Sequence, residues 1–179
     1  NLLLYLVPRN LILESISILT AVKMVFMSVA MYALLNHKFP KLLYPLKTAF
    51  AVMYSLCGYV ILYGSCFTPW MDIVALFPLL MLALDRLLTT GKKLFYIFMV
   101  ALSFIINYYL SAMALIYVFL VSGVYILLLC ERKEWKKHAW NLGIGTAAGM
   151  GLSCFVLIPV FMQLSGSQRG NAGGSIVSQ

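Results

Sequence analysis

The sequence predicts an all-α protein, a polytopic bundle of about six transmembrane helices. Hydrophobic residues make up 63% of the 179 positions, charged residues make up 10%, and the mean hydropathy is +0.97. An average soluble domain carries about 45–50% apolar and about 25% charged residues. So few charged residues cannot cover the surface of a water-soluble globule of this size, which excludes a soluble enzyme. The high apolar content excludes a disordered chain.

The apolar residues fall into stretches that are long enough to cross a membrane, which needs about 20 residues per helix. We expect these stretches to be helical, because an unpaired backbone group in lipid costs several kcal/mol. The block from 94 to 130 is too long for one span, and we divide it at the polar cluster Asn107-Tyr108-Tyr109. The six expected spans are residues 11–35, 48–64, 69–88, 94–106, 110–130 and 139–162.

Local signals support individual spans. Thr68 and Pro69 are typical of a helix N-cap followed by a first-turn proline. Pro78 and Pro159 lie inside spans and should kink them. In the last span, small residues recur four positions apart, which permits close contact with a neighbouring helix. These pairs are Gly145 with Gly149 and Ala147 with Gly151.

Basic residues gather in alternate gaps between the spans. The gaps 36–47, 85–93 and 131–138 hold three, three and four of the thirteen lysines and arginines, whereas 65–68 and the turn at Asn107 hold none. By the positive-inside rule the three basic loops face the cytoplasm, and both ends of the chain lie outside it. The net charge of +8 is therefore mainly an orientation signal, and nucleic acid is not an expected partner.

This topology divides the chain into three parts. Residues 1–10 are expected to end an extracytoplasmic loop, residues 11–162 to form the six-helix region, and residues 163–179 to form an extracytoplasmic polar loop. The chain begins with Asn1 and ends in a glycine-rich polar segment, so we expect it to be an internal piece of a longer protein. The predicted location is therefore a cell membrane, which the chain crosses several times.

Lys23 is the most unusual residue, because it lies at the midpoint of an apolar span. A charge there costs about 2.5–3.5 kcal/mol, so it should face a cavity or a partner. Glu14 is nine residues away, about 13 Å along a helix, which is too far for pairing. Two alternatives stay open: Lys23 meets an anionic ligand such as a lipid phosphate, or it is neutral or paired inside the bundle.

The remaining polar exceptions collect at the predicted outer face. Asp72 either interacts with the dipole of its own helix, near the N-terminus, or contributes to an outward-facing site. Asn107, Tyr108 and Tyr109 either anchor the interface or orient a polar ligand. Arg9 and Arg169 either are solvated or grip a phosphate. Any chemistry should therefore be extracytoplasmic.

No cofactor is evident from the sequence. His37 and His138 fall in cytoplasmic loops and show no metal-ligand or triad spacing. Whether a divalent cation takes part stays open.

Two motifs carry a family resemblance that covers nearly the whole chain. Residues 69–79, PWMDIVALFPL, resemble the W-x-D-x-x-x-L-x-P-L signature of bacterial YfhO-family membrane proteins. Residues 107–113, NYYLSAM, resemble the N-Y-Y-x-x-x-M turn of the same family. The opening NLLLYL, the LIP at 157–159, Ser165 and Arg169 are also similar.

The resemblance implies a membrane glycosyltransferase of the GT-C superfamily. Such an enzyme takes a sugar from a polyprenyl-phosphate carrier and transfers it to an envelope polymer such as lipoteichoic acid, on the outer face. The six spans would be the second to seventh helices of the membrane module. The first helix and the first outer loop, with the acidic catalytic residues, would precede Asn1, so this piece would lack the catalytic base.

The resemblance also assigns expected roles. Lys23, Arg9 and Arg169 would bind the lipid phosphate, and Asp72, Asn107, Tyr108 and Tyr109 would bind sugar or acceptor. The implied partners are membrane lipids, the polyprenyl-phosphate-linked sugar donor and the envelope glycopolymer acceptor. Two alternatives belong to other classes: a lipid or solute transporter, which would favour internal repeats that are not evident here, and a non-catalytic membrane scaffold.

Overall fold

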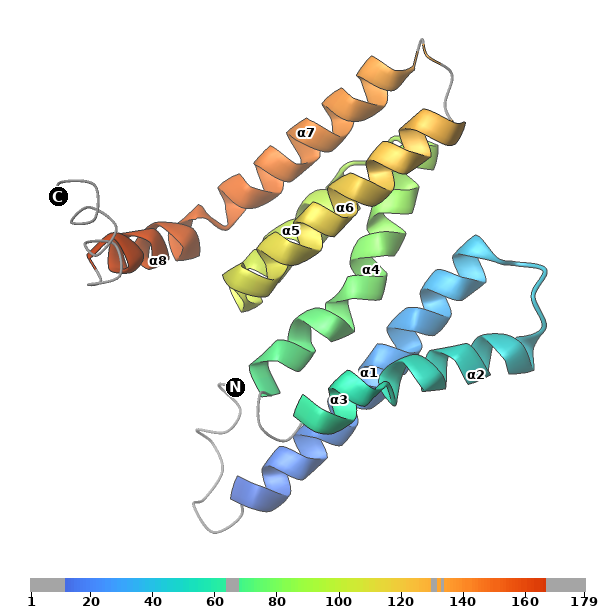
Figure 1. The fold of residues 1–179 in the computed structure, drawn as a ribbon, viewed down its shortest axis with the longest axis vertical. Helices are drawn as coiled ribbons and strands as arrows, with labels where there is room; N and C mark the ends of the chain where they lie inside the picture. The colour runs from blue at the N-terminus through green and yellow to red at the C-terminus, as the bar shows by residue number, and fades with distance from the viewer. Residues whose placement is uncertain (1–11, 64–67, 130–131, 133, 167–179) are drawn as a thin grey trace, which may run out of the picture.

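A computed structural model describes residues 12–63, 68–129, 132 and 134–166, and within these ranges the regular structure is helical without strands. The predicted all-α membrane bundle is confirmed. Successive long helices run in alternate directions (Figure 1). The helices are α1 (Ile12–Lys38), α2 (Tyr44–Ser55), α3 (Gly58–Tyr63), α4 (Thr68–Thr90), α5 (Leu94–Ile106), α6 (Tyr108–Leu129), α7 (Trp135–Leu152) and α8 (Cys154–Gly166).

Fewer segments than six are long and apolar enough to cross a membrane. In the described part of the chain four qualify, namely Ile16–Lys38, Tyr44–Tyr63, Trp70–Thr90 and Tyr108–Leu128. A fifth is obtained when α7 and α8 are taken as one bent span. The segment Leu94–Ile106 has 13 residues, about 20 Å of helix, against a hydrocarbon core of about 30 Å. By length and composition, four or five spans thus qualify in the described residues, and α5 is the shorter apolar helix among the six segments that were expected.

The short helix α5 lies inside the bundle. Its buried residues Tyr96, Met99, Val100 and Phe104 join one apolar core with residues of α4, α6 and α7. A smaller core unites α1, α3 and α4 through Met27, Val60, Met71 and Ala75. Helix α4 contributes to both cores and so connects the two halves of the molecule.

Glycines allow α7 to approach α5 closely. A Cβ on Gly149 would lie 2.7 Å from Val100 Cγ1, and a Cβ on Gly145 would lie 2.9 Å from Tyr96 Cδ1. The second pair of small residues does not form such a contact, because Ala147 is exposed and a Cβ on Gly151 would meet nothing within 4 Å. Only the first of the two predicted small-residue pairs therefore faces a neighbouring helix.

The second span begins earlier than expected, and Lys47 is not in a loop. Helix α2 starts at Tyr44 with a proline in its first turn, so Lys47 lies inside the helix. Its side chain is buried, with 2% exposed, and Nζ donates to Asn36 Oδ1 (2.9 Å) and to the carbonyl oxygen of Pro40 (3.2 Å). Lys47 thus holds the α1–α2 turn together from within.

The last expected span, 139–162, is broken in two. The axes of α7 and α8 differ by 71°. At the break Ser153 is fully buried, and its hydroxyl bonds with the carbonyl oxygens of Gly149 (3.2 Å) and Met150 (2.9 Å). A serine hydroxyl that binds carbonyls of the preceding turn competes with the backbone for them, which favours a bend at this point.

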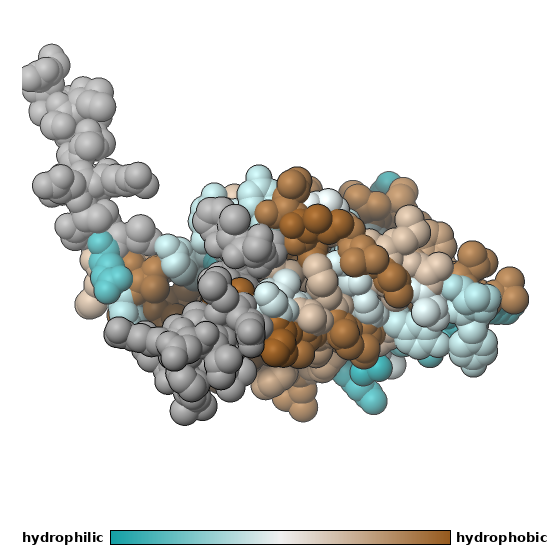
Figure 2. Space-filling model, turned by 90° about the horizontal axis from the view of Figure 1, so that it is seen from below, coloured by the Kyte–Doolittle hydropathy of each residue, from teal (hydrophilic) through white to brown (hydrophobic). Residues whose placement is uncertain are grey.

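The outer surface of the described helices is largely apolar. Figure 2 views the molecule from its lower end in Figure 1 and shows apolar side chains over much of that face, with scattered hydrophilic ones. Along α1 the side chains of Ile18, Val22 and Val25 are 65%, 59% and 63% exposed. Such surfaces suit contact with lipid, because exposing large apolar patches to water is unfavourable.

Candidate functional site

An ion pair joins α1 to α4, and both of its side chains are partly buried. Lys23 Nζ lies 2.6 Å from Asp72 Oδ1, and only 12% of the Lys23 side chain and 27% of the Asp72 side chain are exposed. A lysine at mid-span needs a partner of opposite charge, and Asp72 supplies it from one turn inside α4. Of the two alternatives for Lys23, an anionic ligand or a partner inside the bundle, the structure shows a partner inside the bundle, Asp72.

Further polar contacts fix the helices that carry this pair. Ser28 Oγ of α1 lies 2.8 Å from Ser55 Oγ of α2. The hydroxyl of Tyr54 on α2 donates to the carbonyl oxygen of Val74 on α4 (2.7 Å). These two bonds tie α1, α2 and α4 to one another, so the helices that present Lys23 and Asp72 are held in register.

An open pocket of about 430 Å³ lies among α2, α3, α4 and the start of α6. Most of its lining is apolar, and two tyrosines and one cysteine contribute to it. The lining residues are Tyr54, Cys57, Tyr59, Ile73, Val74, Phe77 and Leu110. Three of these belong to the motif at 69–79, and Leu110 belongs to the motif at 107–113. The two motif segments therefore line one pocket, but through positions that the two signatures leave variable.

Asn107 forms the whole connection between α5 and α6. Its side-chain Oδ1 accepts a hydrogen bond from the backbone N–H of Leu110 (3.2 Å), which is the geometry of an N-cap for α6. Tyr108 and Tyr109 follow at the start of α6 and are 39% and 53% exposed. The side-chain carbonyl oxygen of Asn107 therefore caps the N-terminus of α6.

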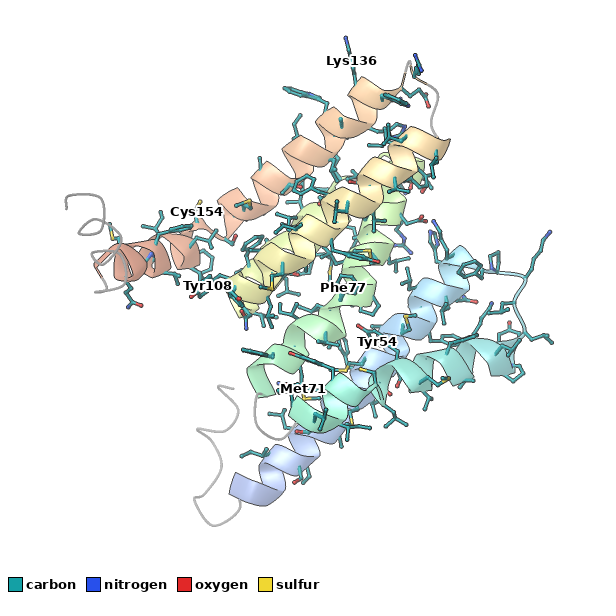
Figure 3. The ribbon with its side chains drawn as sticks, in the orientation of Figure 1. Tyr54, Met71, Phe77, Tyr108, Lys136 and Cys154 are labelled. Atoms are coloured by element: carbon teal, nitrogen blue, oxygen red, sulfur yellow. The ribbon has the colours of Figure 1, made fainter. Side chains whose placement is uncertain are left out.

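The predicted site residues are partly brought together. Lys23 and Asp72 are in direct contact. The turn at Asn107 and the start of α4 lie toward the same, lower end of the molecule, where Figure 3 labels Tyr108 and Met71, whereas Lys136 lies at the opposite end. Arg9 and Arg169 lie outside the described residues.

A second group of charges lies at the end of the bundle that carries the basic loops. Asp85 of α4 pairs with Lys38 and, at 3.2 Å, with His37 Nε2, both at the end of α1. Sequence reasoning missed this cluster, because neither periodicity nor spacing connects His37 and Lys38 with Asp85 of α4. It also missed the burial of Lys47, whose partners lie across the α1–α2 turn. Among the described residues there is no group of three or more His, Cys, Asp or Glu side chains that could hold a metal ion.

Comparison with known proteins gives the family. The family model described as "Bacterial membrane protein YfhO" matches residues 1–178. No curated protein and no solved structure matches the chain significantly. A match over 1–178 leaves only the last residue outside it, and it includes both motifs. The chain belongs to the YfhO family of bacterial membrane proteins.

Proposed function

We propose that this chain is part of a membrane glycosyltransferase that moves a sugar from a polyprenyl-phosphate carrier to an envelope polymer such as lipoteichoic acid. The observation that carries the proposal is the Lys23–Asp72 ion pair within an apolar bundle of this family. A charged pair inside a membrane segment marks a functional site by default, since it is costly to maintain. An open pocket lies on α4, the helix that carries Asp72, although Lys23 and Asp72 do not themselves line it.

In this proposal the chain's residues divide the work between phosphate and sugar. Lys23, Arg9 and Arg169 stabilise the phosphate as it leaves, because a cation offsets the charge that develops on its oxygen. Asp72, Asn107, Tyr108 and Tyr109 position the sugar or the acceptor. The bond between the anomeric carbon and the phosphate oxygen breaks, and the acceptor oxygen forms the new bond. Its proton passes to a carboxylate base that precedes Asn1 in the family resemblance.

The orientation belongs to the same proposal. The loops rich in lysine and arginine lie at one end of the bundle and the proposed site lies toward the other. With the basic loops in the bacterial cytoplasm, both ends of this chain and the site face outward. The partners are then membrane lipids, the lipid-linked donor and the glycopolymer acceptor, with no part for nucleic acid.

The test separates a role in transfer from a role in folding. In the full-length protein, Lys23→Met and Asp72→Asn should each lower sugar transfer from a radiolabelled polyprenyl-phosphate sugar by at least about tenfold, which corresponds to about 1.4 kcal/mol of transition-state stabilisation. The exchanged variant Lys23→Asp/Asp72→Lys should recover the melting temperature, because the pair is kept, but not the transfer. Asp85→Asn, which alters the other ion-paired aspartate of α4, is the matched control and should keep transfer.

Two results would count against the proposal. If Asp72→Asn is expressed normally and transfers sugar normally, Asp72 is not part of the site. If the wild-type protein instead moves a lipid or solute across vesicles without transferring sugar, the transporter alternative is correct.

A further inference from the structure

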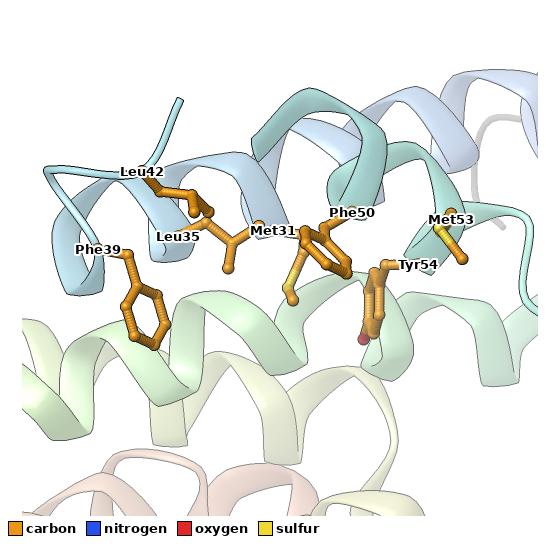
Figure 4. A pocket seen from close by; sticks show the side chains of 7 residues that line it. All are labelled: Met31, Leu35, Phe39, Leu42, Phe50, Met53 and Tyr54. Atoms are coloured by element: carbon orange, nitrogen blue, oxygen red, sulfur yellow. The ribbon is translucent and has the colours of Figure 1, made fainter. Parts of the chain in front are cut away.

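A long apolar groove runs beside the end of α1, away from the ion pair. One part has a volume of about 570 Å³, and Figure 4 shows side chains of α1, α2 and the connecting turn gathered around it. A second part, of about 340 Å³, continues between α1, α4 and α6. Both parts are lined by Met31, Leu35 and Phe39, so they meet along the same face of α1.

The groove has a floor and two walls. Met31 and Leu35 of α1 form the floor. Phe50, Met53 and Tyr54 of α2 form one wall, and the other is made by residues of α4 and α6, namely Met81, Leu84, Leu88, Val121 and Tyr125. Two apolar branches that meet at Phe39 fit a ligand with two hydrocarbon chains.

The mouth of the groove is basic. A third hollow of about 520 Å³ is lined by Lys38, Phe39, Pro40, Lys41 and Leu42, and it meets the two apolar branches at Phe39. Lys38 is balanced by Asp85 and lies 5.7 Å from the centre of the Tyr125 ring. Lys41 is exposed and supplies the net positive charge of the mouth.

The turn that presents this mouth is held in place from inside. Lys47 binds the carbonyl oxygen of Pro40 and the side chain of Asn36, so the backbone between α1 and α2 is fixed on both sides of Phe39. The position of Lys41 beside the apolar branches is therefore part of the fold.

We infer that this groove binds an anionic glycerophospholipid, with its two acyl chains in the apolar branches and its phosphate at Lys41. Basic pockets between transmembrane helices bind acidic headgroups on the side of the membrane that carries the basic loops. Met31 is eight residues beyond Lys23, about 12 Å along α1, and Lys41 is farther still, so this lipid site is distinct from the ion-pair site. The inference does not depend on the proposed transferase activity.

The full-length protein in non-ionic detergent provides the test. Native mass spectrometry would measure binding of phosphatidylglycerol and of phosphatidylcholine with the same acyl chains. We expect one retained phosphatidylglycerol, bound at least about fivefold more tightly than phosphatidylcholine. Lys41→Gln should weaken the binding of phosphatidylglycerol about fivefold, which is the effect of one lysine near an acidic headgroup. Lys92→Gln, in another basic loop, should leave this binding unchanged.

A second pair of variants tests the apolar branches. Leu35→Trp fills the floor that both branches share and should abolish the single-lipid adduct. Val29→Trp, on the same helix at a position 60% exposed, should leave it intact. Equal binding of the two lipids, unchanged binding in Lys41→Gln, or displacement of phosphatidylglycerol by a long-chain polyprenyl phosphate would overturn the inference. Because Lys41 is exposed, its variant stays informative even if Leu35→Trp fails to fold.

Discussion

The hydroxyl of Tyr54 donates a hydrogen bond to the backbone carbonyl oxygen of Val74, at 2.7 Å. The carbonyl is available because Pro78 lies four residues later inside α4, and proline has no N–H to donate to it. A lone backbone carbonyl within a membrane span is costly, and a side chain from α2 relieves that cost. Pro78 leaves the Val74 carbonyl without a partner inside α4, and the hydrogen bond from α2 supplies that partner.

We predict that Tyr54→Phe lowers the free energy of unfolding by about 1 kcal/mol, the scale of an interhelical hydrogen bond in a membrane protein. In a Pro78→Ala background the residue at 78 regains its N–H and can bind the Val74 carbonyl. The cost of Tyr54→Phe should therefore shrink in that background. Thermal unfolding of the four full-length proteins, arranged as a double-mutant cycle, measures this coupling. Equal costs in both backgrounds would contradict the shared role.

Gly149→Ala should destabilise the protein by about 1–3 kcal/mol, the usual range for overfilling a well-packed contact. The added Cβ would lie 2.7 Å from Val100 Cγ1 and 3.1 Å from the carbonyl oxygen of Ile97. Combining it with Val100→Ala should recover part of the loss, since the nearest methyl group is removed. Gly143→Ala, in the same helix with nothing within 4 Å, is the control and should be neutral or slightly stabilising. A loss as large in the control would show that the contact with Val100 is not the cause.

Asn107→Ala should cost about 1 kcal/mol, because α6 loses its N-cap. Asn107→Asp keeps an oxygen that can accept the Leu110 N–H, so its melting temperature should stay close to that of the wild type. If the amide also positions a ligand, as proposed, Asn107→Asp lowers sugar transfer without lowering stability. Full stability together with full transfer would limit Asn107 to capping.

Lys47→Met should lower the free energy of unfolding by about 2 kcal/mol, the range for hydrogen bonds made by a charged group. The reason is that the two hydrogen bonds made by the buried Lys47 ammonium group, to the Asn36 side chain and the Pro40 carbonyl, are lost. Lys92→Met, at an exposed position of another basic loop, should change stability by less than about 0.5 kcal/mol. Similar melting temperatures for the two variants would indicate that Lys47 serves only as a charge.

The fold class and the family could be predicted because they rest on composition and on two short motifs. The boundaries of the helices could not be predicted in the same way. Hydropathy alone does not show that α2 begins at Tyr44, although Pro45 in its first turn was a usable signal. It also gives no sign of the break at Ser153, where one hydroxyl competes for carbonyls inside an otherwise apolar run.

The candidate site was predictable to the extent that each of its residues was an exception in its own span. Lys23 and Asp72 stood out separately, because a charge in lipid needs a reason. Their contact depends on the crossing of α1 and α4, which is a tertiary property that no local pattern encodes. The same limit explains why Lys47 was interpreted as an orientation signal, since its partners lie across a turn.

The bend at Ser153 divides the last apolar segment into parts of unequal local stability. Helix α7 is held by the close approach of Gly145 and Gly149 to α5, whereas in α8 Leu157 is buried and Phe155, Ile158 and Phe161 are exposed. Segments with few buried contacts open at lower free energy than the core. Helix α8 can therefore separate from the bundle as a unit while α7 stays in place, and amide hydrogen exchange should show this as weaker protection after residue 153 than before it.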